Sequence, residues 1–220
     1  MKPLLIIDFD STFIKDETLD EIAKFSSINN TPNTREEIIN ITNQAMEGEL
    51  DFRTALKKRI NLLKIHKNEI QKITAILQKR VSDSFLKNKR KIQSLKNSIY
   101  IISGGFKEII IPIVKDFGIS EEHVFANQLT YDKEGFINGV DTKSDLSYSD
   151  GKIKALKTLS LKYGAYVIGD GSTDLDMKQV NGVNAFICFT ENINRVSISS
   201  KADYTASNLD QVFNIIDKVR

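Results

Sequence analysis

The sequence predicts an α/β fold with a parallel sheet, a helical segment inserted after the first strand, and a small β-hairpin. The run "PLLIIDFD" is continuously apolar before it reaches two aspartates, which is typical of a strand buried on both faces. From about residue 16 to about residue 80 the chain has few glycines, and its apolar residues recur every three or four positions. After residue 98, strand and helix patterns alternate, which indicates a parallel sheet covered by helices.

The first part of the chain contains one strand and several helices. Residues 3–10 form the predicted strand, and Pro32 within the polar run "SSINNTPNT" separates the first helix from the second. The helical segment is too long to be one crossover helix between two strands. We therefore expect a cap formed by residues 15–81, inserted into a core formed by residues 1–14 and 82–220.

The second part of the chain supplies the remaining elements of the sheet. Each apolar run is followed by a turn signal and then by a helical pattern. The predicted elements are a strand at 98–106, a helix at 107–118, a strand and hairpin at 123–140 with its turn at 132–135, a helix at 150–164, a strand and loop at 165–174, a helix at 175–183, a strand at 184–189, and a last strand near 202–204 before a terminal helix.

Composition excludes several classes of protein. Of the 220 residues 40% are apolar, as in a globular protein. The 31 basic and 29 acidic residues give a net charge of +2, so nothing favours nucleic acid or a membrane surface as a partner. No apolar run is long enough to span a bilayer or to act as a signal peptide. The single cysteine, Cys188, is expected to be buried. A cytoplasmic location is expected.

Polar residues gather where three predicted strands end. Asp8 and Asp10 close the first strand, Ser103 and Gly104 close the second, and a loop from Asp170 to Asp174 closes a third. The helix between the last two of these strands carries Lys152 near its beginning. Because ligands of open parallel sheets bind beyond the carboxyl ends of the strands, these side chains are expected to meet at one edge.

Together these residue types favour phosphoryl transfer. Clustered carboxylates repel one another unless a cation holds them, and oxygen ligands suit Mg²⁺. A hydroxyl from Ser103, an amide from Gly104 and the ammonium of Lys152 or Lys154 would bind a phosphate. Each motif alone is also common as a helix cap or a tight turn, so the prediction depends on their joint occurrence. Thr12 is expected to hold the first loop and to orient Asp10 or the phosphate.

Four motifs in this order, "DFDST", "ISGGF", "DGK" and "GDGSTD", resemble those of the haloacid-dehalogenase superfamily of phosphatases. The position of the helical segment is similar to that in members whose helical cap follows the first motif. The segments "DFDSTFIKDETLDEIA" and "AMEGELDFRTALKKRINLLK" resemble the phosphoserine phosphatases within that superfamily. Ser172 and Thr173 depart from the alanine and asparagine of many members. The resemblance implies a Rossmann-like core.

The resemblance also implies a role for each matching residue. Asp8 would be the nucleophile, and Asp10 would be the general acid and then the base. Mg²⁺ would be held by Asp8, the main-chain carbonyl of Asp10, Asp170 and Asp174. The substrate would be bound by Ser103, Gly104, Lys152 and Thr173 at its phosphate, by Glu17 at its ammonium and by Arg59 at its carboxylate, with Met46 and Phe52 helping the cap to close.

The implied reaction is the Mg²⁺-dependent hydrolysis of O-phosphoserine to serine and phosphate through an aspartyl-phosphate, the last step of serine biosynthesis. The implied partner is a small phosphate monoester, and the chain would act as a monomer or homodimer. A phosphatase or phosphotransferase for another small monoester is an alternative. A phospho-acceptor regulator without turnover is a third hypothesis, which an acid beside the nucleophile disfavours. Without the resemblance, we would interpret Glu17 as a helix N-terminal acid and Arg59 as a surface charge.

Overall fold

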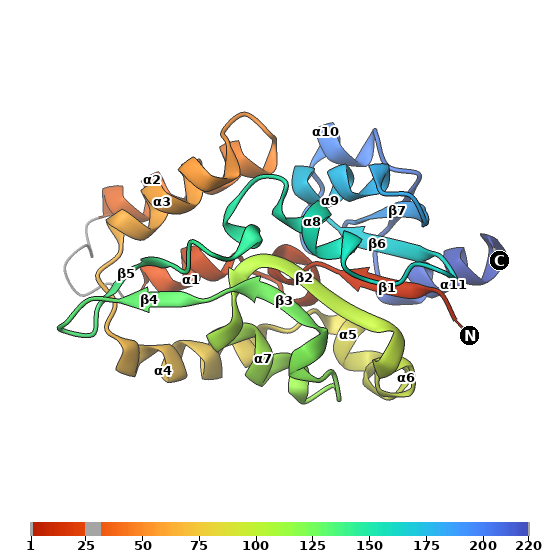
Figure 1. Ribbon diagram of the computed structural model, residues 1–220, viewed down its shortest axis with the longest axis horizontal. Helices are drawn as coiled ribbons and strands as arrows, with labels where there is room; N and C mark the ends of the chain where they lie inside the picture. Colours follow the sequence, from red (N-terminus) through yellow and green to blue (C-terminus); the bar gives the residue numbers. More distant parts are fainter. Residues whose placement is uncertain (1, 25–31, 220) are drawn as a thin grey trace.

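The computed structural model describes residues 2–24 and 32–219. Its main feature is a six-stranded sheet in the order β3-β2-β1-β6-β7-β8, in which every neighbouring pair is parallel (Figure 1). The α/β prediction with a parallel sheet is therefore confirmed. The strands of this sheet are β1 (Leu4–Ile7), β2 (Ile99–Phe106), β3 (Val124–Asn127), β6 (Ala165–Gly169), β7 (Val183–Phe189) and β8 (Tyr204–Ala206).

Apolar side chains fill both faces of the sheet, because successive residues of a strand point to opposite sides. In β1, Leu5 and Ile7 pack into one core cluster and Ile6 packs into the other. The first face is covered by α5 (Asp83–Lys87), α6 (Lys89–Leu95), α7 (Lys107–Lys115) and α11 (Leu209–Val219). The second is covered by α8 (Gly151–Lys157), α9 (Ser172–Asp176) and α10 (Val196–Ser199). Burial on both faces explains why the strand segments are continuously apolar in the sequence.

Two of the predicted helices have different bounds. The helix predicted at 150–164 ends at Lys157, where the Thr158 hydroxyl donates to the carbonyl of Ala155 at 2.7 Å and competes with further helical bonding. The helix predicted from residue 175 already begins at Ser172. In the described ranges, no helix is both long and apolar enough to cross a lipid bilayer.

The β-hairpin consists of β4 (Leu129–Tyr131) and β5 (Ile137–Val140), which pair in antiparallel fashion. The side chain of Asp132 accepts the backbone N–H groups of Glu134 and Phe136 and so closes the turn, as predicted. The hairpin lies beside α3, and its tip also binds the beginning of the helix at Lys67–Leu77, where the carbonyl of Gly135 accepts the N–H of Lys67 at 2.9 Å.

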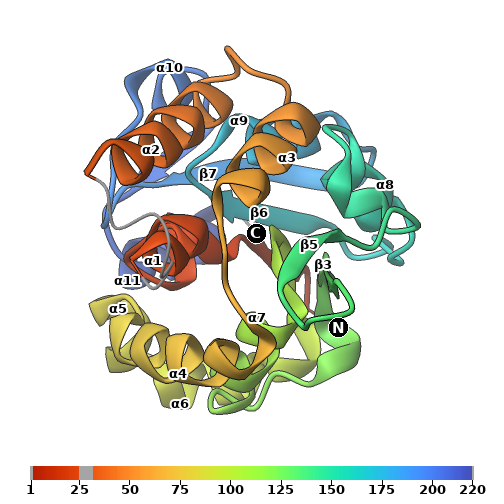
Figure 2. The ribbon, with the colours of Figure 1, turned by 90° about the vertical axis from the view of Figure 1, so that its left-hand side faces the viewer.

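The inserted segment contains α1 (Thr18–Ala23), α2 (Pro32–Met46), α3 (Phe52–Leu62) and α4 (Lys67–Leu77). These helices do not form one separate bundle. Figure 2 shows α4 beside α7 of the core, with α2 and α3 together on the other side. Ile41, Ala45 and Ala55 make a small cluster of their own between α2 and α3. The α2–α3 pair therefore has a small apolar cluster of its own, whereas α4 packs on a helix of the core.

The two ends of the inserted segment lie side by side. Ile14 pairs with Val81 in an isolated antiparallel bridge. The N–H of Ser82 donates to the carbonyl of Phe13 at 3.0 Å, and the N–H of Lys15 donates to the carbonyl of Arg80 at 2.8 Å. The chain thus leaves the core and returns to it at a single place.

Candidate active site

The three predicted loops meet in one small cavity at the carboxyl edge of the sheet, beneath α3. Most of the residues selected from the sequence line it. They come from the loop after β1, from α1, from α3, from the end of β2 and from α8 and α9. The lining consists of Asp8, Asp10, Glu17, Leu19, Phe52, Arg59, Ser103, Gly104, Gly105, Phe106, Lys152 and Thr173.

The loop after β1 is anchored by aromatic packing. Phe13 is fully buried, and its ring lies 4.7 Å from that of Phe85 and 5.0 Å from that of Phe117, measured between centroids. Ser11 adopts a left-handed backbone conformation, with φ of 53°, where the chain turns away from the strand. The Thr12 hydroxyl donates to Asp170 Oδ1 at 3.3 Å. The Thr12 hydroxyl thus binds the loop after β6 rather than Asp10, and its part in orienting a phosphate stays a prediction.

Three buried carboxylates form the centre of the site. One oxygen from each of Asp8, Asp170 and Asp174 lies within 4.8 Å of the others. Burial, and then the neighbouring Asp8 charge, raise the pKa of Asp174 to about 7. Burial and the charges of Glu17 and Asp8 also raise the pKa of Asp170. Such repulsion is relieved when a cation binds, so this cluster fits a metal ion with oxygen ligands.

Lys152 joins two of these carboxylates. Its Nζ donates to Asp8 at 2.8 Å and to Asp174 at 2.7 Å, and all three side chains are buried. Burial opposes its charge, but the carboxylates of Asp174 and Asp8 raise the pKa of Lys152, which therefore remains a cation. The alternative, Lys154, is exposed and pairs with Asp150 at 3.0 Å outside the cavity. Of the two lysines considered, Lys152 is the one at the site.

The side chain of Asp174 reaches the cluster across a glycine. A Cβ atom on Gly169, the last residue of β6, would lie 2.4 Å from Cγ of Asp174. Any larger residue at this position would displace the carboxylate. The Gly-Asp-Gly sequence is thus more than a tight loop, because its first glycine makes room for an acid five residues further along the chain.

Asp10 is held separately from the three clustered carboxylates. Its Oδ1 accepts the backbone N–H of Thr18, at 3.0 Å, and the hydroxyl of the same residue. Burial and the nearby Glu17 raise the pKa of Asp10 well above its usual range, although the bonds from Thr18 oppose this. A carboxyl group with a raised pKa retains a proton that it can donate, which suits a general acid.

The end of β2 supplies polar groups to the cavity wall. The Ser103 hydroxyl is buried and accepts the N–H of Gly105 at 3.0 Å. The side chain of Asn127, on β3, donates to the carbonyls of Gly104 and Leu146 at 2.9 and 3.1 Å. Asn127 thereby ties the Gly104 peptide to the loop that precedes α8, a supporting role that the sequence analysis missed.

Phe52 closes the cavity from the side of α3. A Cβ atom on Gly104 would lie 2.4 Å from Cζ of the Phe52 ring, so the ring packs directly on the glycine. Thr173 lines the cavity from α9. Met46 ends α2, and its side chain lies outside the described part of the structure.

Two opposite charges lie at the α1–α3 end of the cavity. Arg59, on α3, is only 3% exposed, and Glu17 immediately precedes α1. Burial lowers the pKa of Arg59, whereas the charges of Glu17, Asp20 and Asp10 oppose that shift. The structure therefore excludes the interpretation of Arg59 as a surface charge.

A second buried arginine was not predicted. Arg195 follows β7, and its Nε–H donates to Asp170 at 3.1 Å, while its Nη2 lies 3.6 Å from Glu17. The Ser11 hydroxyl also donates to Glu17, at 2.7 Å. The available signal was the apolar run at 184–189, because the loop after this strand reaches the same edge of the sheet as the other three.

A wider groove with a volume of about 400 Å³ lies between α3 and the hairpin, and Arg53, Lys57, Asn61 and Thr130 are among its lining residues. Its lining contains no carboxylate, so the chemistry gathers in the smaller cavity beneath Phe52.

The carboxyl edge of the parallel sheet thus holds clustered carboxylates, a buried lysine, and a serine and a glycine of β2, which together define a phosphoryl-transfer enzyme of the α/β class. A family model for haloacid dehalogenase-like hydrolases matches residues 5–179, and the chain belongs to this family. Relatives within the family are phosphoserine phosphatases. The chloroplastic phosphoserine phosphatase of Arabidopsis thaliana is 30% identical, over 96% of this chain and 70% of the relative.

Solved structures support the same relationship. A phosphoserine phosphohydrolase-like protein from Francisella tularensis superimposes with a TM-score of 0.87 at 30% identity, covering 98% of this chain and 100% of that protein. A phospho-aspartyl intermediate analogue of phosphoserine phosphatase superimposes with a TM-score of 0.75 at 26% identity, covering 97% and 98% of the two chains.

Proposed function

We propose that this protein is a Mg²⁺-dependent phosphatase that hydrolyses O-phosphoserine to serine and phosphate through an aspartyl-phosphate, and so performs the last step of serine biosynthesis. One observation carries the proposal. A single cavity is lined by Asp8, Asp10 and Lys152 and also by Glu17 and Arg59, and Asp8 belongs to the cluster with Asp170 and Asp174. Phosphoserine carries groups that match these charges: a phosphate, an ammonium and a carboxylate. Relatives and structural neighbours named phosphoserine phosphatase support this assignment.

The phosphate end would hold the metal and the nucleophile. We propose that Asp8, Asp170, Asp174 and the main-chain carbonyl of Asp10 hold Mg²⁺, which would neutralise negative charge between the carboxylates and the phosphate. Lys152, the Ser103 hydroxyl, the Gly104 amide and Thr173 would bind the phosphate oxygens. Because Lys152 contacts Asp8, it would bring the phosphate next to that carboxylate.

The reaction would proceed in two displacements. A carboxylate oxygen of Asp8 attacks phosphorus, the bond from phosphorus to the serine oxygen breaks, and Asp10 donates its proton to that oxygen. Asp10 then accepts a proton from a water that attacks the aspartyl-phosphate, which releases phosphate and restores Asp8. The raised pKa of Asp10 supports the first of these proton transfers.

Arg59 and Glu17 would recognise the amino-acid part of the substrate. The guanidinium of Arg59 can bind the substrate carboxylate in bidentate fashion, and Glu17, held by Ser11 and Arg195, would accept the ammonium. Phe52 and Met46 would cover the substrate from α3 and from the end of α2. We also propose that residues 15–81 act as the cap on a core of 1–14 and 82–220, a division supported by the pairing of Ile14 with Val81.

Substrate specificity is tested with a panel of phosphate monoesters, assayed with Mg²⁺ and with EDTA. We expect O-phosphoserine to be preferred and Asp8→Asn to abolish phosphate release. Arg59→Ala is expected to raise KM for phosphoserine far more than for p-nitrophenyl phosphate, which has no carboxylate. Equal losses on both substrates would remove the amino-acid specificity and favour another monoester, or a phosphotransferase if an alcohol accepts the phosphate. A stable aspartyl-phosphate without turnover would indicate a regulator.

Location and assembly are separate proposals. We propose a cytoplasmic protein, supported by its one free, buried cysteine, Cys188, which suits a reducing compartment. It would act as a monomer or a homodimer. Cell fractionation tests the first statement, and light scattering coupled to size-exclusion chromatography tests the second.

A further inference from the structure

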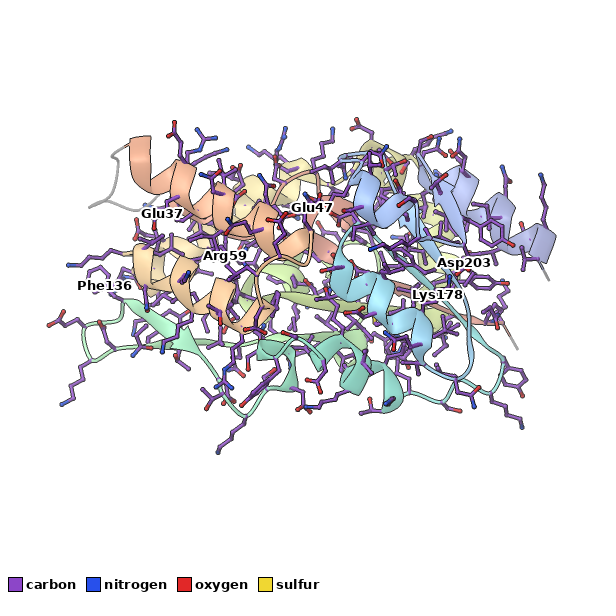
Figure 3. All side chains as sticks on the ribbon, turned by 90° about the horizontal axis from the view of Figure 1, so that it is seen from above. Glu37, Glu47, Arg59, Phe136, Lys178 and Asp203 are labelled. Carbon is purple, nitrogen blue, oxygen red and sulfur yellow. The ribbon has the colours of Figure 1, made fainter. Side chains whose placement is uncertain are left out.

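Behind the arginine that faces the cavity lies a chain of hydrogen bonds that is buried at Arg59 and Thr42 and partly buried at Asp20. Arg59 Nη1 donates to the hydroxyl of Thr42 at 3.2 Å, and that hydroxyl lies 2.9 Å from Asp20 Oδ1. The three residues come from α3, α2 and α1, which pack on one another (Figure 3 labels Arg59 where α2 and α3 run side by side). Arg59 lines the cavity, whereas Thr42 and Asp20 do not.

The direction of these bonds follows from the number of protons. A guanidinium only donates, so the Thr42 oxygen accepts from Arg59. The Thr42 hydroxyl has one proton and two acceptors at 2.9 Å, Asp20 Oδ1 and the carbonyl of Ile38. An ionised carboxylate is the stronger acceptor of the two. With Asp20 ionised, the hydroxyl therefore donates to Asp20 and keeps its lone pairs directed at Arg59.

Charge links the same residues. Asp20 is partly buried near Glu17 and Arg59, and Thr42 is 1% exposed. The charges of Glu17 and Asp20 oppose the effect of burial on Arg59, so each contributes to keeping that buried guanidinium charged. Arg59 also donates to the carbonyl of Ala55 on its own helix at 3.3 Å. Among the described residues Arg59 makes these two hydrogen bonds, so its remaining N–H groups can serve a ligand in the cavity.

We propose that Asp20 and Thr42 are positioning residues that fix the orientation of Arg59 and thereby determine the preference for phosphate monoesters that carry a carboxylate. This inference rests on the proposed function. Neither residue contacts the substrate, and both act through the guanidinium. Loss of the Thr42 hydroxyl would leave one N–H of Arg59 unpaired and would free the side chain to rotate, so the substrate carboxylate would no longer meet a fixed bidentate partner.

The test compares two substrates across matched variants at pH 8, where Asp20 is ionised. Thr42→Val keeps the shape of the side chain but removes the hydroxyl, Thr42→Ser keeps the hydroxyl, and Asp20→Asn removes the charge. We expect Thr42→Val and Asp20→Asn to raise KM for O-phosphoserine about tenfold or more, since hydrogen bonds to charged groups are strong, and to change kcat/KM for p-nitrophenyl phosphate far less. Thr42→Ser should restore a KM close to that of the wild type.

Thr74→Val is the matched control. Thr74 is a buried threonine on α4 whose hydroxyl donates to the carbonyl four residues earlier, at 2.8 Å, as the Thr42 hydroxyl can. It has no role at the site, so its replacement should leave both substrates unaffected. Circular dichroism and thermal melting would show that each variant folds.

A double-mutant cycle decides whether Thr42 acts through Arg59. If it does, adding Thr42→Val to Arg59→Ala should cause no further loss on phosphoserine. Additive losses, equal losses on both substrates, or failure of Thr42→Ser to restore KM would overturn the inference while leaving the proposed function intact. If the wild-type protein does not prefer phosphoserine over p-nitrophenyl phosphate, the proposed function and the inference fail together.

Discussion

Among single side chains, the carboxylate form of Asp20 is less stable in the folded protein than in water. Burial, and then the charge of Glu17, raise the pKa of Asp20 from 3.8 to about 6, although Thr42 and Arg59 lower it in part. The folded protein therefore binds this proton more tightly than the unfolded chain does. Asp20 contributes most to stability while protonated, and its contribution is lost as the pH rises from 3.8 through about 6.

The variant Asp20→Asn should therefore flatten the pH dependence of stability. We expect the free energy of unfolding of the wild-type protein, relative to that of the variant, to fall as the pH is raised from 4 to 7 and then to level off. Urea denaturation at several pH values measures this difference. Asp217→Asn, at an exposed position on α11, serves as the control and should give a curve parallel to that of the wild type. Parallel curves for Asp20→Asn as well would contradict the assignment.

Side chains also differ in how much of their role a sequence reveals. Asp8 and Asp170 could be selected because they follow apolar runs, and Lys152 because it lies near the beginning of the helix between two of the strands and adds the cation that one chemistry requires. The partner of Thr12 could not be, since its hydroxyl binds Asp170 across 158 positions of the sequence. Arg195 was missed for the same reason, because an arginine in a loop is usually exposed, and only the contact with Asp170 and Glu17 distinguishes this one.

Between secondary-structure elements, α3 approaches the end of β2 directly over the site. Phe52 is the first residue of α3, and its ring lies on Gly104 near the end of β2. Asp51 caps the same helix by accepting the N–H of Thr54 at 2.9 Å, and its other oxygen accepts the hydroxyl of Ser149. The beginning of α3 is thus fixed to the core at two points, one apolar and one polar.

Gly104→Ala should disturb this closure. The added methyl group would overlap the Phe52 ring, which must then move together with the start of α3. We expect kcat/KM for phosphoserine to fall by about 100-fold, the order of magnitude attached to a 1 Å displacement at a reacting centre. Adding Phe52→Leu should recover part of this loss, because a smaller side chain relieves the overlap. A double variant no more active than Gly104→Ala would show that the ring is not the cause.

The hydrogen bonds of the loop after β7 could not be predicted from the sequence. The side chain of Asn192 donates to the carbonyl of Ser11 at 3.0 Å and contacts the Ser82 hydroxyl at 2.8 Å. Glu191 accepts the N–H of Ser84 at 3.0 Å. This loop therefore fastens both ends of the inserted segment, yet it has no repeating pattern, and its polar residues resemble those of any surface loop. Strand and helix patterns are local, whereas these bonds join positions more than 100 residues apart.

Over the full chain, the distribution of charge explains why a metal ion would stabilise the fold. Asp8, Asp170 and Asp174 are buried together, and Lys152 and Arg195 are the cations that contact them in the described part of the chain. A bound divalent cation would offset the remaining repulsion in the folded state, because Asp8 is far from Asp170 and Asp174 once the chain unfolds and the three-carboxylate cluster is lost.

Mg²⁺ should accordingly raise the free energy of unfolding, by about 2.7 kcal/mol at a concentration 100 times Kd. Urea denaturation with Mg²⁺, with EDTA and with NaCl at equal ionic strength measures the effect. Asp170→Asn should reduce it, since that variant lacks one proposed ligand. Stabilisation no greater than that produced by NaCl would exclude a metal site in this cluster.

The fold itself was predictable from the sequence to a large extent. Because β1 and β6 are buried on both faces, their sequences are continuously apolar, which predicts the parallel sheet. The residues of the turn at Asp132 are typical turn residues, which predicts the hairpin. The packing of α4 on α7 could not be predicted. Both helices are amphipathic, and an amphipathic pattern shows that a helix has a buried face but not which element covers it.

The bridge between Ile14 and Val81 has a consequence for how this protein family can diversify. Since Ile14 and Val81 pair with each other, a change of length between them would leave the pairing of the sheet strands intact wherever the packing of α4 on α7 is kept. Asp8, Lys152, Asp170 and Asp174 lie outside that segment, whereas Glu17, Phe52 and Arg59 lie within it. An exchange of one contiguous stretch of gene could therefore change which molecule is recognised and leave the reaction as it is.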